Sequence, residues 1–238
     1  MREKLENIIK QVSLRVLFAA VTFFIALYIF ALVTDEVIIE KEEQFDHAIF
    51  HLLADDLTPG LIQVMRFFTF FGKAEFLIPA YILLIIYFVI IRKKQYAIET
   101  AIMGGSSTLL LFGLKDLFQR RRPHMPLLEH LNGFSFPSGH ALLNFVFSSM
   151  LIYLTWNSQL TKGMKWTLAV FLLLFSLVVG ISRIVLRVHY ASDVIAGFCL
   201  GYAWVIFALW VQRRYMNHKK LLAGIDKEKE VASVRVHE

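Results

Sequence analysis

Residues 182–193 have the sequence SRIVLRVHYASD and join two long apolar segments of the chain. The stretch contains two arginines, a histidine and an aspartate at the point where a membrane-spanning helix would meet the bilayer surface. Charges so close to lipid carry a high free-energy cost, so they require an explanation. One explanation is a functional site, and the other is an interfacial anchor that contains a His–Asp pair by chance.

The spacing of the residues within this stretch favours a functional site. His189 and Asp193 are four residues apart, so a regular helix starting near His189 would place both on one face. A carboxylate there can hold the imidazole in one tautomer and leave the other ring nitrogen free to attack or to bind a proton. The arginines before this pair favour a forked anion such as phosphate as the group that is attacked.

The composition is that of a membrane protein. Of the 238 residues, 57% are hydrophobic and 18% are charged, and the mean hydropathy is +0.59. These values favour one membrane-embedded domain. The net charge is +6, but the basic residues lie at the ends of apolar segments, which indicates membrane orientation rather than nucleic-acid binding.

Six apolar segments are long enough to cross about 30 Å of hydrocarbon as helices. They cover residues 14–34, 75–91, 96–118, 140–156, 164–184 and 189–211. Residues 35–74 are acidic and are interrupted by Thr58-Pro59-Gly60, in which Thr58 is a candidate N-cap, and this pattern predicts short amphipathic helices at the interface. In the first of these helices, at residues 44–57, we expect Leu52 on the apolar face and Asp46 on the solvated face. These helices either gate lipid access or cover the helix bundle. We therefore predict an all-α, polytopic membrane protein with six transmembrane helices plus interfacial amphipathic helices.

The predicted organisation is a single membrane-embedded domain over residues 1–238. It consists of a cytoplasmic N-terminus (1–13), a first span (14–34), an extracytoplasmic segment (35–74), a five-span core (75–212) and a cytoplasmic tail (213–238). Six spans place both termini and the basic residues 92–94 on one side, which the positive-inside rule identifies as the cytoplasm. The sequence has no Asn-x-Ser/Thr sequon, which favours a bacterial source and hence the bacterial cytoplasmic membrane.

Several basic residues lie on the opposite, outer side against this rule. They are Lys115, Arg120, Arg121, Arg122, Arg183 and Arg187. Lys115 and Arg122 are close to two helical turns apart, so one helix face can carry both before Pro123 ends the helix. We interpret Arg120 and Arg121 as cations that neutralise the helix C-terminal dipole, and Arg187 as an interfacial cation.

A third motif, Pro137-Ser138-Gly139-His140, immediately precedes a predicted span. Ser138 is a natural N-cap, and the free N–H groups of the first helical turn can bind an anion. His140 is well placed to give a proton to a leaving oxygen. On its own, this tetrapeptide is also explained by plain helix capping.

Together, the three motifs resemble the signature of the type-2 phosphatidic acid phosphatases, which are integral-membrane lipid phosphate phosphatases. The matching elements are Lys115-x6-Arg122-Pro123, Pro137-Ser138-Gly139-His140 and Ser182-Arg183-x5-His189-x3-Asp193. With the six-helix layout included, the resemblance covers roughly residues 75–212.

The resemblance implies a role for each matching residue. His189 is the expected nucleophile that forms a phosphohistidine, Asp193 orients it, and His140 protonates the leaving group. The phosphate oxygens are then held by Lys115, Arg122, Ser138, Gly139 and Arg183. The motifs offer no Asp/Glu cluster for Mg²⁺, so we expect no metal and no other cofactor.

The implied partner is a lipid phosphate substrate within the membrane. The layout is most like that of bacterial phosphatidylglycerophosphate phosphatases, which predicts conversion of phosphatidylglycerophosphate to phosphatidylglycerol. Undecaprenyl pyrophosphate, phosphatidate and diacylglycerol pyrophosphate are alternative substrates, and a lipid phosphotransferase is an alternative activity. A transporter is disfavoured because the interiors of the first, second, fifth and sixth spans are almost wholly apolar.

Overall fold

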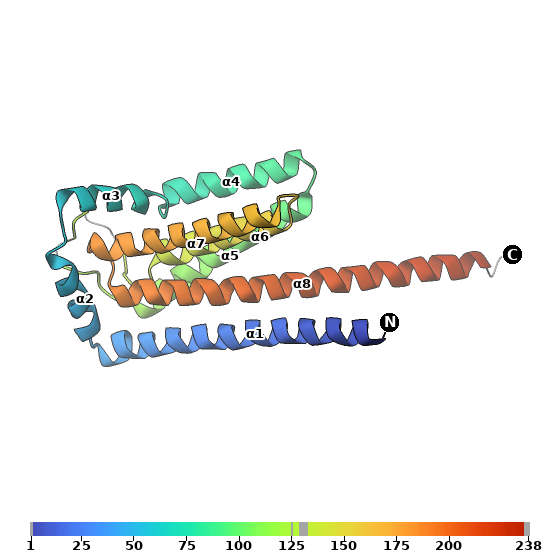
Figure 1. Cartoon of the computed structure of the whole chain (residues 1–238), viewed down its shortest axis with the longest axis horizontal. Helices are drawn as coiled ribbons and strands as arrows, with labels where there is room; N and C mark the ends of the chain where they lie inside the picture. The colour runs from blue at the N-terminus through green and yellow to red at the C-terminus, as the bar shows by residue number, and fades with distance from the viewer. Residues whose placement is uncertain (1, 125, 129–132, 236–238) are drawn as a thin grey trace. The chain divides into compact units, whose positions relative to one another are not determined.

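The computed structural model describes residues 2–124, 126–128 and 133–235, and throughout these ranges the regular structure is helical (Figure 1). The elements are α1 (Arg2–Thr34), a π-helix η1 (Asp35–Glu40), α2 (Gln44–Ala54), α3 (Pro59–Phe70), α4 (Ala74–Ile90), α5 (Lys94–Phe118), α6 (Gly139–Trp156), α7 (Lys162–Val185) and α8 (Ala191–Arg235). Residues up to Val205 form one unit that contains the whole site discussed below, and the rest of α8 forms a second unit.

Among the described residues, six helical segments are long and apolar enough to cross a membrane. Their bounds are Val16–Glu40, Pro59–Ile90, Lys94–Phe118, Gly139–Trp156, Lys162–Val185 and Ala191–Met216. Large apolar side chains such as Leu83, Leu109 and Phe171 are exposed on these helices, as a lipid-facing surface requires. The predicted all-α, six-span membrane architecture is confirmed.

Some helix ends differ from those predicted. α1 begins at Arg2, so the N-terminal segment and the first span form one continuous helix. Thr58 caps α3 as expected, accepting a hydrogen bond from the Leu61 N–H (3.2 Å), and α3 and α4 together form the second candidate span. α8 begins at Ala191, so His189 lies just before the helix rather than within it.

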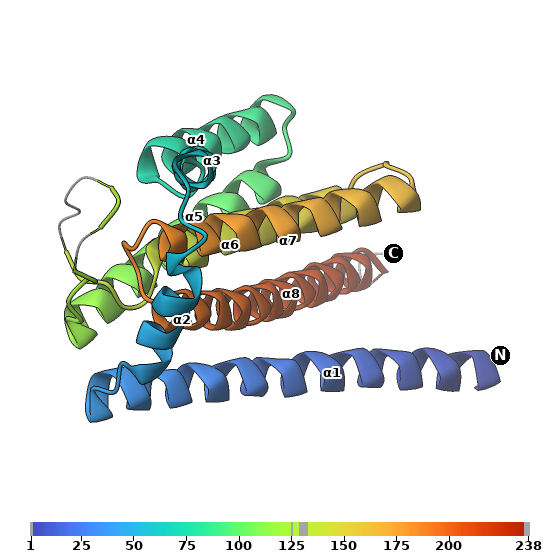
Figure 2. The same ribbon diagram turned by 60° about the vertical axis from the view of Figure 1, so that its left-hand side comes forward.

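The three motifs meet at one end of the first unit. Figure 1 shows α2 at the same end as the α5–α6 and α7–α8 connections, whereas the α4–α5 and α6–α7 connections lie at the other end. Figure 2 shows α2 crossing this end between α1 and α3. α6 packs against both α5 and α7, and α3 packs against α7.

Two glycines bring the start of α8 against the start of α6. A Cβ atom on Gly197 would lie 2.7 Å from the backbone oxygen of Ser138, and one on Gly201 would lie 3.3 Å from the backbone oxygen of Leu142. This is a G-x-x-x-G spacing, which lets membrane helices approach closely. The close approach places the first turn of α8 beside the Pro-Ser-Gly-His segment.

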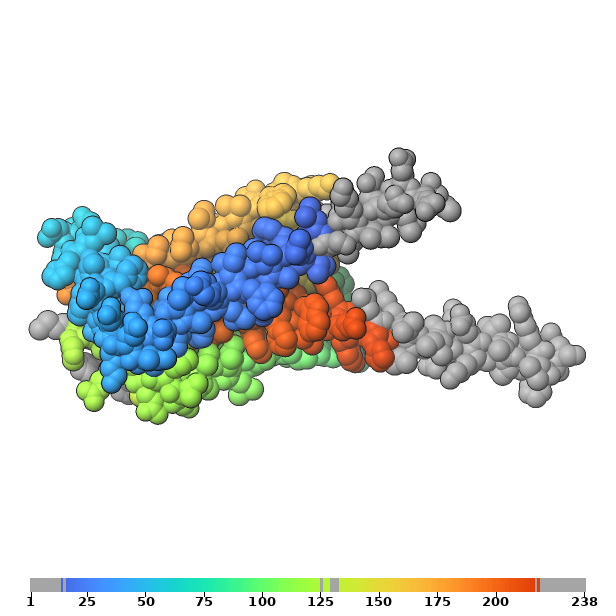
Figure 3. All heavy atoms as spheres, turned by 90° about the horizontal axis from the view of Figure 1, so that it is seen from below, coloured from blue at the N-terminus to red at the C-terminus, as the bar shows by residue number. Residues whose placement is uncertain are grey.

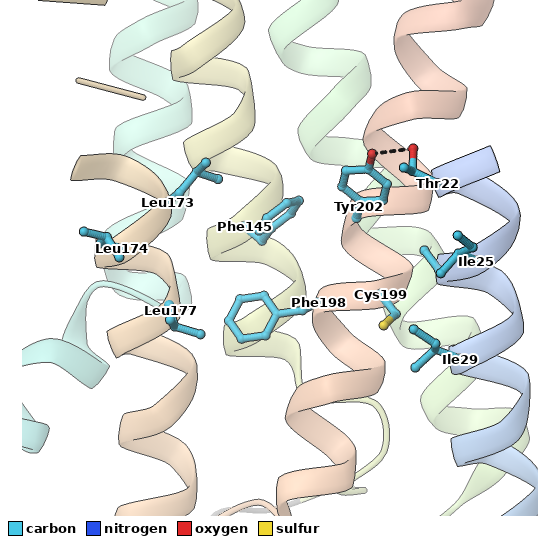
Figure 4. Close-up of a pocket in the computed structure, with 11 residues that line it drawn as sticks. Thr22, Ile25, Ile29, Phe145, Leu173, Leu174, Leu177, Phe198, Cys199 and Tyr202 are labelled. Atoms are coloured by element: carbon cyan, nitrogen blue, oxygen red, sulfur yellow. Dashed lines mark hydrogen bonds between the residues drawn. The ribbon is translucent and has the colours of Figure 1, made fainter. Parts of the chain in front are cut away.

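α1 is attached more loosely on another face. Figure 3 shows α1 lying across one face of the helices, next to α7. A cavity of about 500 Å³, lined almost entirely by apolar side chains, separates α1 from α6, α7 and α8 (Figure 4). Across it, the Tyr202 hydroxyl donates to the Thr22 hydroxyl (2.8 Å), which ties α1 to α8.

We expect Gly197→Ala to lower the melting midpoint of the detergent-solubilised protein, because its Cβ would clash with backbone that cannot move aside. A destabilisation of about 1–3 kcal/mol is typical of such overpacking. Gly113→Ala is the matched control, since nothing lies within 4 Å of its Cβ position and alanine favours helix. Equal midpoints for the two variants would contradict the proposed close contact between α6 and α8.

Candidate active site

The site is built around the buried carboxylate of Asp193, in the first turn of α8. Its side chain is 0% exposed. Oδ2 accepts hydrogen bonds from the Tyr190 N–H (2.9 Å) and the Ser135 hydroxyl, and lies 3.3 Å from His189 Nδ1. Oδ1 accepts one from Arg120 Nη1 at 2.8 Å. A carboxylate with this many donors is fixed in position and stays ionised.

The neighbours of His189 define its tautomer. Nε2 lies 3.3 Å from Arg122 Nη1, and a guanidinium can only donate, so Nε2 is the acceptor. The ring proton therefore sits on Nδ1 and points to Asp193. Burial, which leaves the ring 2% exposed, lowers the pKa of His189 to about 3, although Asp193 opposes this shift. The result is a neutral imidazole whose Nε2 lone pair faces a cation.

Arg122 and Arg183 lie close enough to His189 for their charges to act on the ring, and Lys115 lies close enough to both arginines to interact with their charges. Lys115 Nζ donates to the backbone oxygens of Phe134 (2.6 Å) and Ser135 (3.3 Å). Arg183 is buried, donates to the Thr69 hydroxyl of α3, and keeps a buried Nε that has no partner among the described residues. The structure thus brings Lys115, Arg122 and Arg183 together.

Arg122 lies in the site, but it is not on the same helix as Lys115, contrary to the prediction from the sequence. α5 ends at Phe118, and Gln119 adopts a left-handed conformation (φ 50°), so Arg122 is not on a continuous helix with Lys115. Instead, its guanidinium is held by the backbone oxygens of Val188 (2.9 Å) and Gly133 (3.1 Å). Burial lowers the pKa of Arg122, against the opposing effect of Asp193.

The Pro-Ser-Gly-His segment lies beside Asp193. Ser138 caps α6, and its backbone N–H donates to the backbone oxygen of Asp193 (3.0 Å). Gly139 follows as the first residue of α6. The His140 ring packs so closely on Gly72 that a Cβ there would lie 2.5 Å from it, and its buried Nε2 has no partner among the described residues. A buried ring nitrogen without a partner is unusual, because buried polar groups are normally hydrogen-bonded.

The interpretation of Arg120 as a cation that neutralises the helix dipole is wrong. Its side chain is 7% exposed and bridges two carboxylates, Asp193 (2.8 Å) and Asp46 (2.9 Å). It also stacks on the ring of Tyr190, 4.1 Å from the ring centroid. Burial alone would lower the pKa of Arg120, but the two carboxylates outweigh burial and raise it.

The predicted orientation of the helix at residues 44–57, which corresponds to α2, is also wrong. We assigned Asp46 to the solvated face and Leu52 to the apolar face, whereas Asp46 is 1% exposed and Leu52 is 74% exposed. Asp46 accepts hydrogen bonds from the Ser192 N–H (2.9 Å) and the Ser192 hydroxyl, in addition to Arg120. The helix is rotated relative to the prediction. The buried network supplies hydrogen-bond partners for the Asp46 carboxylate, whereas exposing the apolar side chain of Leu52 at the membrane interface costs little free energy.

Sequence reasoning therefore missed Asp46, Arg120, Ser135, Ser192 and Thr69. Asp46 is followed by Ile49, Phe50 and Leu53, an i, i+3, i+4, i+7 stripe that could have indicated its inward position. Within the described ranges, no group of three or more His, Cys, Asp or Glu side chains is arranged to hold a metal ion. The positive charge of the site comes from lysine and arginine.

A multi-pass membrane fold with a buried His–Asp pair, faced by three cations, defines a membrane enzyme that acts on phosphate. The chain belongs to the PAP2 superfamily, whose family model matches residues 95–217. It is a lipid phosphatase of that superfamily.

Known relatives agree with this assignment. Phosphatidylglycerophosphatase B of Bacillus subtilis (strain 168) is 31% identical over 144 residues, which cover 60% of this chain and 71% of the relative. YbjG of Escherichia coli (strain K12), named as a candidate undecaprenyl-diphosphatase, is 28% identical over 134 residues, 53% of this chain and 62% of that relative. The crystal structure of a PAP2-type phosphatidylglycerolphosphate phosphatase from Bacillus subtilis superposes with a TM-score of 0.68 at 25% identity, covering 82% of this chain and 96% of that one.

We expect Asp46→Asn to lower the melting midpoint strongly, because Arg120 would lose one of its two buried carboxylates. Breaking a buried ion pair from one side typically costs about 3–5 kcal/mol. Asp56→Asn, which neutralises an exposed carboxylate just after α2, is the control and should leave the midpoint unchanged. Similar midpoints for both variants would show that the Asp46–Arg120 pair contributes nothing to stability.

The His189 ring should remain neutral, with its proton on Nδ1, down to about pH 4, one unit above its pKa of about 3. Nitrogen-15 NMR of histidine-labelled protein measures this directly, with the His189 signals assigned by their loss in His189→Gln. An exposed histidine titrates near pH 6.5. Titration of His189 near that value would contradict the buried, neutral imidazole.

Proposed function

We propose that this protein removes phosphate from a membrane lipid through a phosphohistidine intermediate on His189. The observation that carries the proposal is the arrangement of this ring, with Nδ1–H held by Asp193 and the Nε2 lone pair facing Arg122. A neutral, oriented imidazole of this kind is an activated nucleophile.

In the first step, Nε2 of His189 attacks the phosphorus and forms a P–N bond while the P–O bond to the lipid breaks. The leaving oxygen takes a proton from His140, whose buried Nε2 has no protein partner among the described residues. The positive charge that develops on the His189 ring is stabilised by Asp193 through the Nδ1 hydrogen bond.

In the second step, His140 accepts a proton from water, and the water oxygen attacks the phosphorus. The P–N bond breaks, orthophosphate is released, and His189 returns to its neutral form. The phosphate oxygens are held in both steps by Lys115, Arg122 and Arg183, with the Ser138 hydroxyl and the Gly139 N–H at the start of α6.

The reaction is metal-independent in this proposal. Three cationic side chains meet at the site, and Arg183 keeps a buried N–H without a partner among the described residues. These groups can neutralise the charge of a phosphoryl transition state, which is the task that Mg²⁺ performs in many other phosphotransferases.

The substrate best supported is phosphatidylglycerophosphate, which would yield phosphatidylglycerol. The support is the likeness in sequence to phosphatidylglycerophosphatase B of Bacillus subtilis, and the likeness in structure to a Bacillus subtilis phosphatase named for that activity. Undecaprenyl pyrophosphate is the second candidate, favoured by the likeness to YbjG. By the positive-inside rule, both termini lie in the cytoplasm of a bacterial cell and the site faces outward.

Purified protein should release orthophosphate from these lipids in detergent micelles containing EDTA, and vanadate should inhibit it. His189→Ala should lower the rate by at least about a thousandfold, because it removes the nucleophile. His218→Ala changes an exposed histidine on α8 and should retain the wild-type rate. Ranking the lipids by kcat/KM should place phosphatidylglycerophosphate first.

Three results would count against the proposal. A near-native rate in His189→Ala would rule out the phosphohistidine intermediate on this residue. Strict dependence on Mg²⁺ would rule out the metal-independent mechanism. Transfer of labelled phosphate to a lipid alcohol without release of orthophosphate would make the protein a phosphotransferase.

A further inference from the structure

A cavity with charged lining residues lies beside His189. It has a volume of about 490 Å³ and opens between α2 and the α5–α6 and α7–α8 connections. Arg122 belongs to both places, because it lines this cavity and its Nη1 lies 3.3 Å from His189 Nε2. Tyr190, which directly follows the catalytic histidine, forms another part of the wall.

The charged side chains that line this cavity are mainly arginines. Arg121 and Arg187, which we interpreted from the sequence as helix-end and interfacial cations, both line it. Three histidines, His47, His51 and His124, line the same cavity. Two arginines outside the phosphate signature therefore line the same cavity as Arg122, which contacts His189.

The acidic side chains nearby do not cancel this charge. Glu43 is the one carboxylate among the described lining residues, and it lies 3.8 Å from Arg120 and 3.4 Å from His47. Arg120 itself is engaged by Asp46 and Asp193. Arg187 lies 5.9 Å from the centroid of the Phe50 ring, a cation–π contact that positions its guanidinium without neutralising it.

We propose that this cavity is a second phosphate-binding site, in which Arg121 and Arg187 hold a phosphate group next to the one that is cleaved. The proposal rests on the proposed lipid phosphatase activity. Guanidinium groups bind phosphate through two parallel hydrogen bonds, and paired arginines make such a site selective for it.

Two sources of phosphate fit this chemistry. Phosphatidylglycerophosphate and undecaprenyl pyrophosphate each carry a second phosphate that remains on the lipid after cleavage. Alternatively, the site receives the orthophosphate product, which must leave toward water while the lipid product returns to the bilayer. A polar cavity beside a buried nucleophile provides that route.

The first experiment compares lipids with one and two phosphates in detergent micelles. Phosphatidate carries one phosphate, whereas phosphatidylglycerophosphate and diacylglycerol pyrophosphate carry two. If the site holds a lipid phosphate, Arg187→Gln and Arg121→Gln should each lower kcat/KM for the two-phosphate lipids by about tenfold, with phosphatidate changed by less than about twofold. Arg92→Gln is the matched control, since Arg92 is exposed, lies just after α4 and has a φ of 59°, close to the 52° of Arg187.

The second experiment uses inorganic phosphate as the probe and needs no turnover. If the site holds the product, phosphate should raise the melting midpoint of the wild-type protein and of Arg92→Gln, and Arg187→Gln should require about tenfold more phosphate for the same rise. Inhibition of phosphatidate hydrolysis by phosphate should also change from mixed to purely competitive in Arg187→Gln.

A change in either experiment supports the site and identifies the source of its phosphate. The proposal is overturned if Arg187→Gln and Arg121→Gln match Arg92→Gln in both the substrate ratio and the phosphate-dependent midpoint. The proposed lipid phosphatase activity fails on a different result, namely that the wild-type protein hydrolyses none of these lipids.

Discussion

The site depends on one buried ion-pair network, in which the guanidinium of Arg120 bridges the carboxylates of Asp46 and Asp193. Two carboxylates with 1% and 0% exposure could not remain ionised inside a helix bundle without a cation between them. Arginine suits this role because its planar fork can donate to two acceptors at once and stays charged when buried. With Asp193 fixed in this way, its other oxygen is free to hold the proton-bearing nitrogen of His189.

This network makes α2 part of the site, and α3 contributes to the site as well. α2 contributes Asp46, and α3 contributes Thr69, whose hydroxyl accepts a hydrogen bond from Arg183. Arg66 of α3 also donates to the backbone oxygen of Leu127, in the α5–α6 connection, at 2.8 Å. From the sequence, these helices either gated lipid access or covered the bundle. Their polar contacts give them a further role, because moving α2 would expose the charge that holds Asp193.

The parts of this structure that were predictable from the sequence are those that depend on local patterns. The long apolar segments predicted the six candidate membrane spans, and Ser138 was recognisable as an N-cap from its residue type and position. The partners of Asp46 were not predictable, because Arg120 and Ser192 are 74 and 146 residues away in the chain. Arg120, Arg121 and Arg122 have the same chemistry, and the left-handed turn at Gln119 breaks the helical geometry that would have distinguished them.

The contact between Arg122 and Nε2 of His189 links substrate binding to reactivity in the proposed mechanism. Arg122 donates to the very lone pair that would attack phosphorus, so this hydrogen bond must be exchanged before the reaction. A phosphate oxygen carries negative charge and is a stronger acceptor for a guanidinium than a neutral imidazole is. Phosphate binding therefore draws the N–H of Arg122 away from Nε2 and frees the nucleophile. Because the Nδ1 side of the ring stays bound to Asp193, the exchange alters only the reactive nitrogen and leaves the orientation of His189 unchanged.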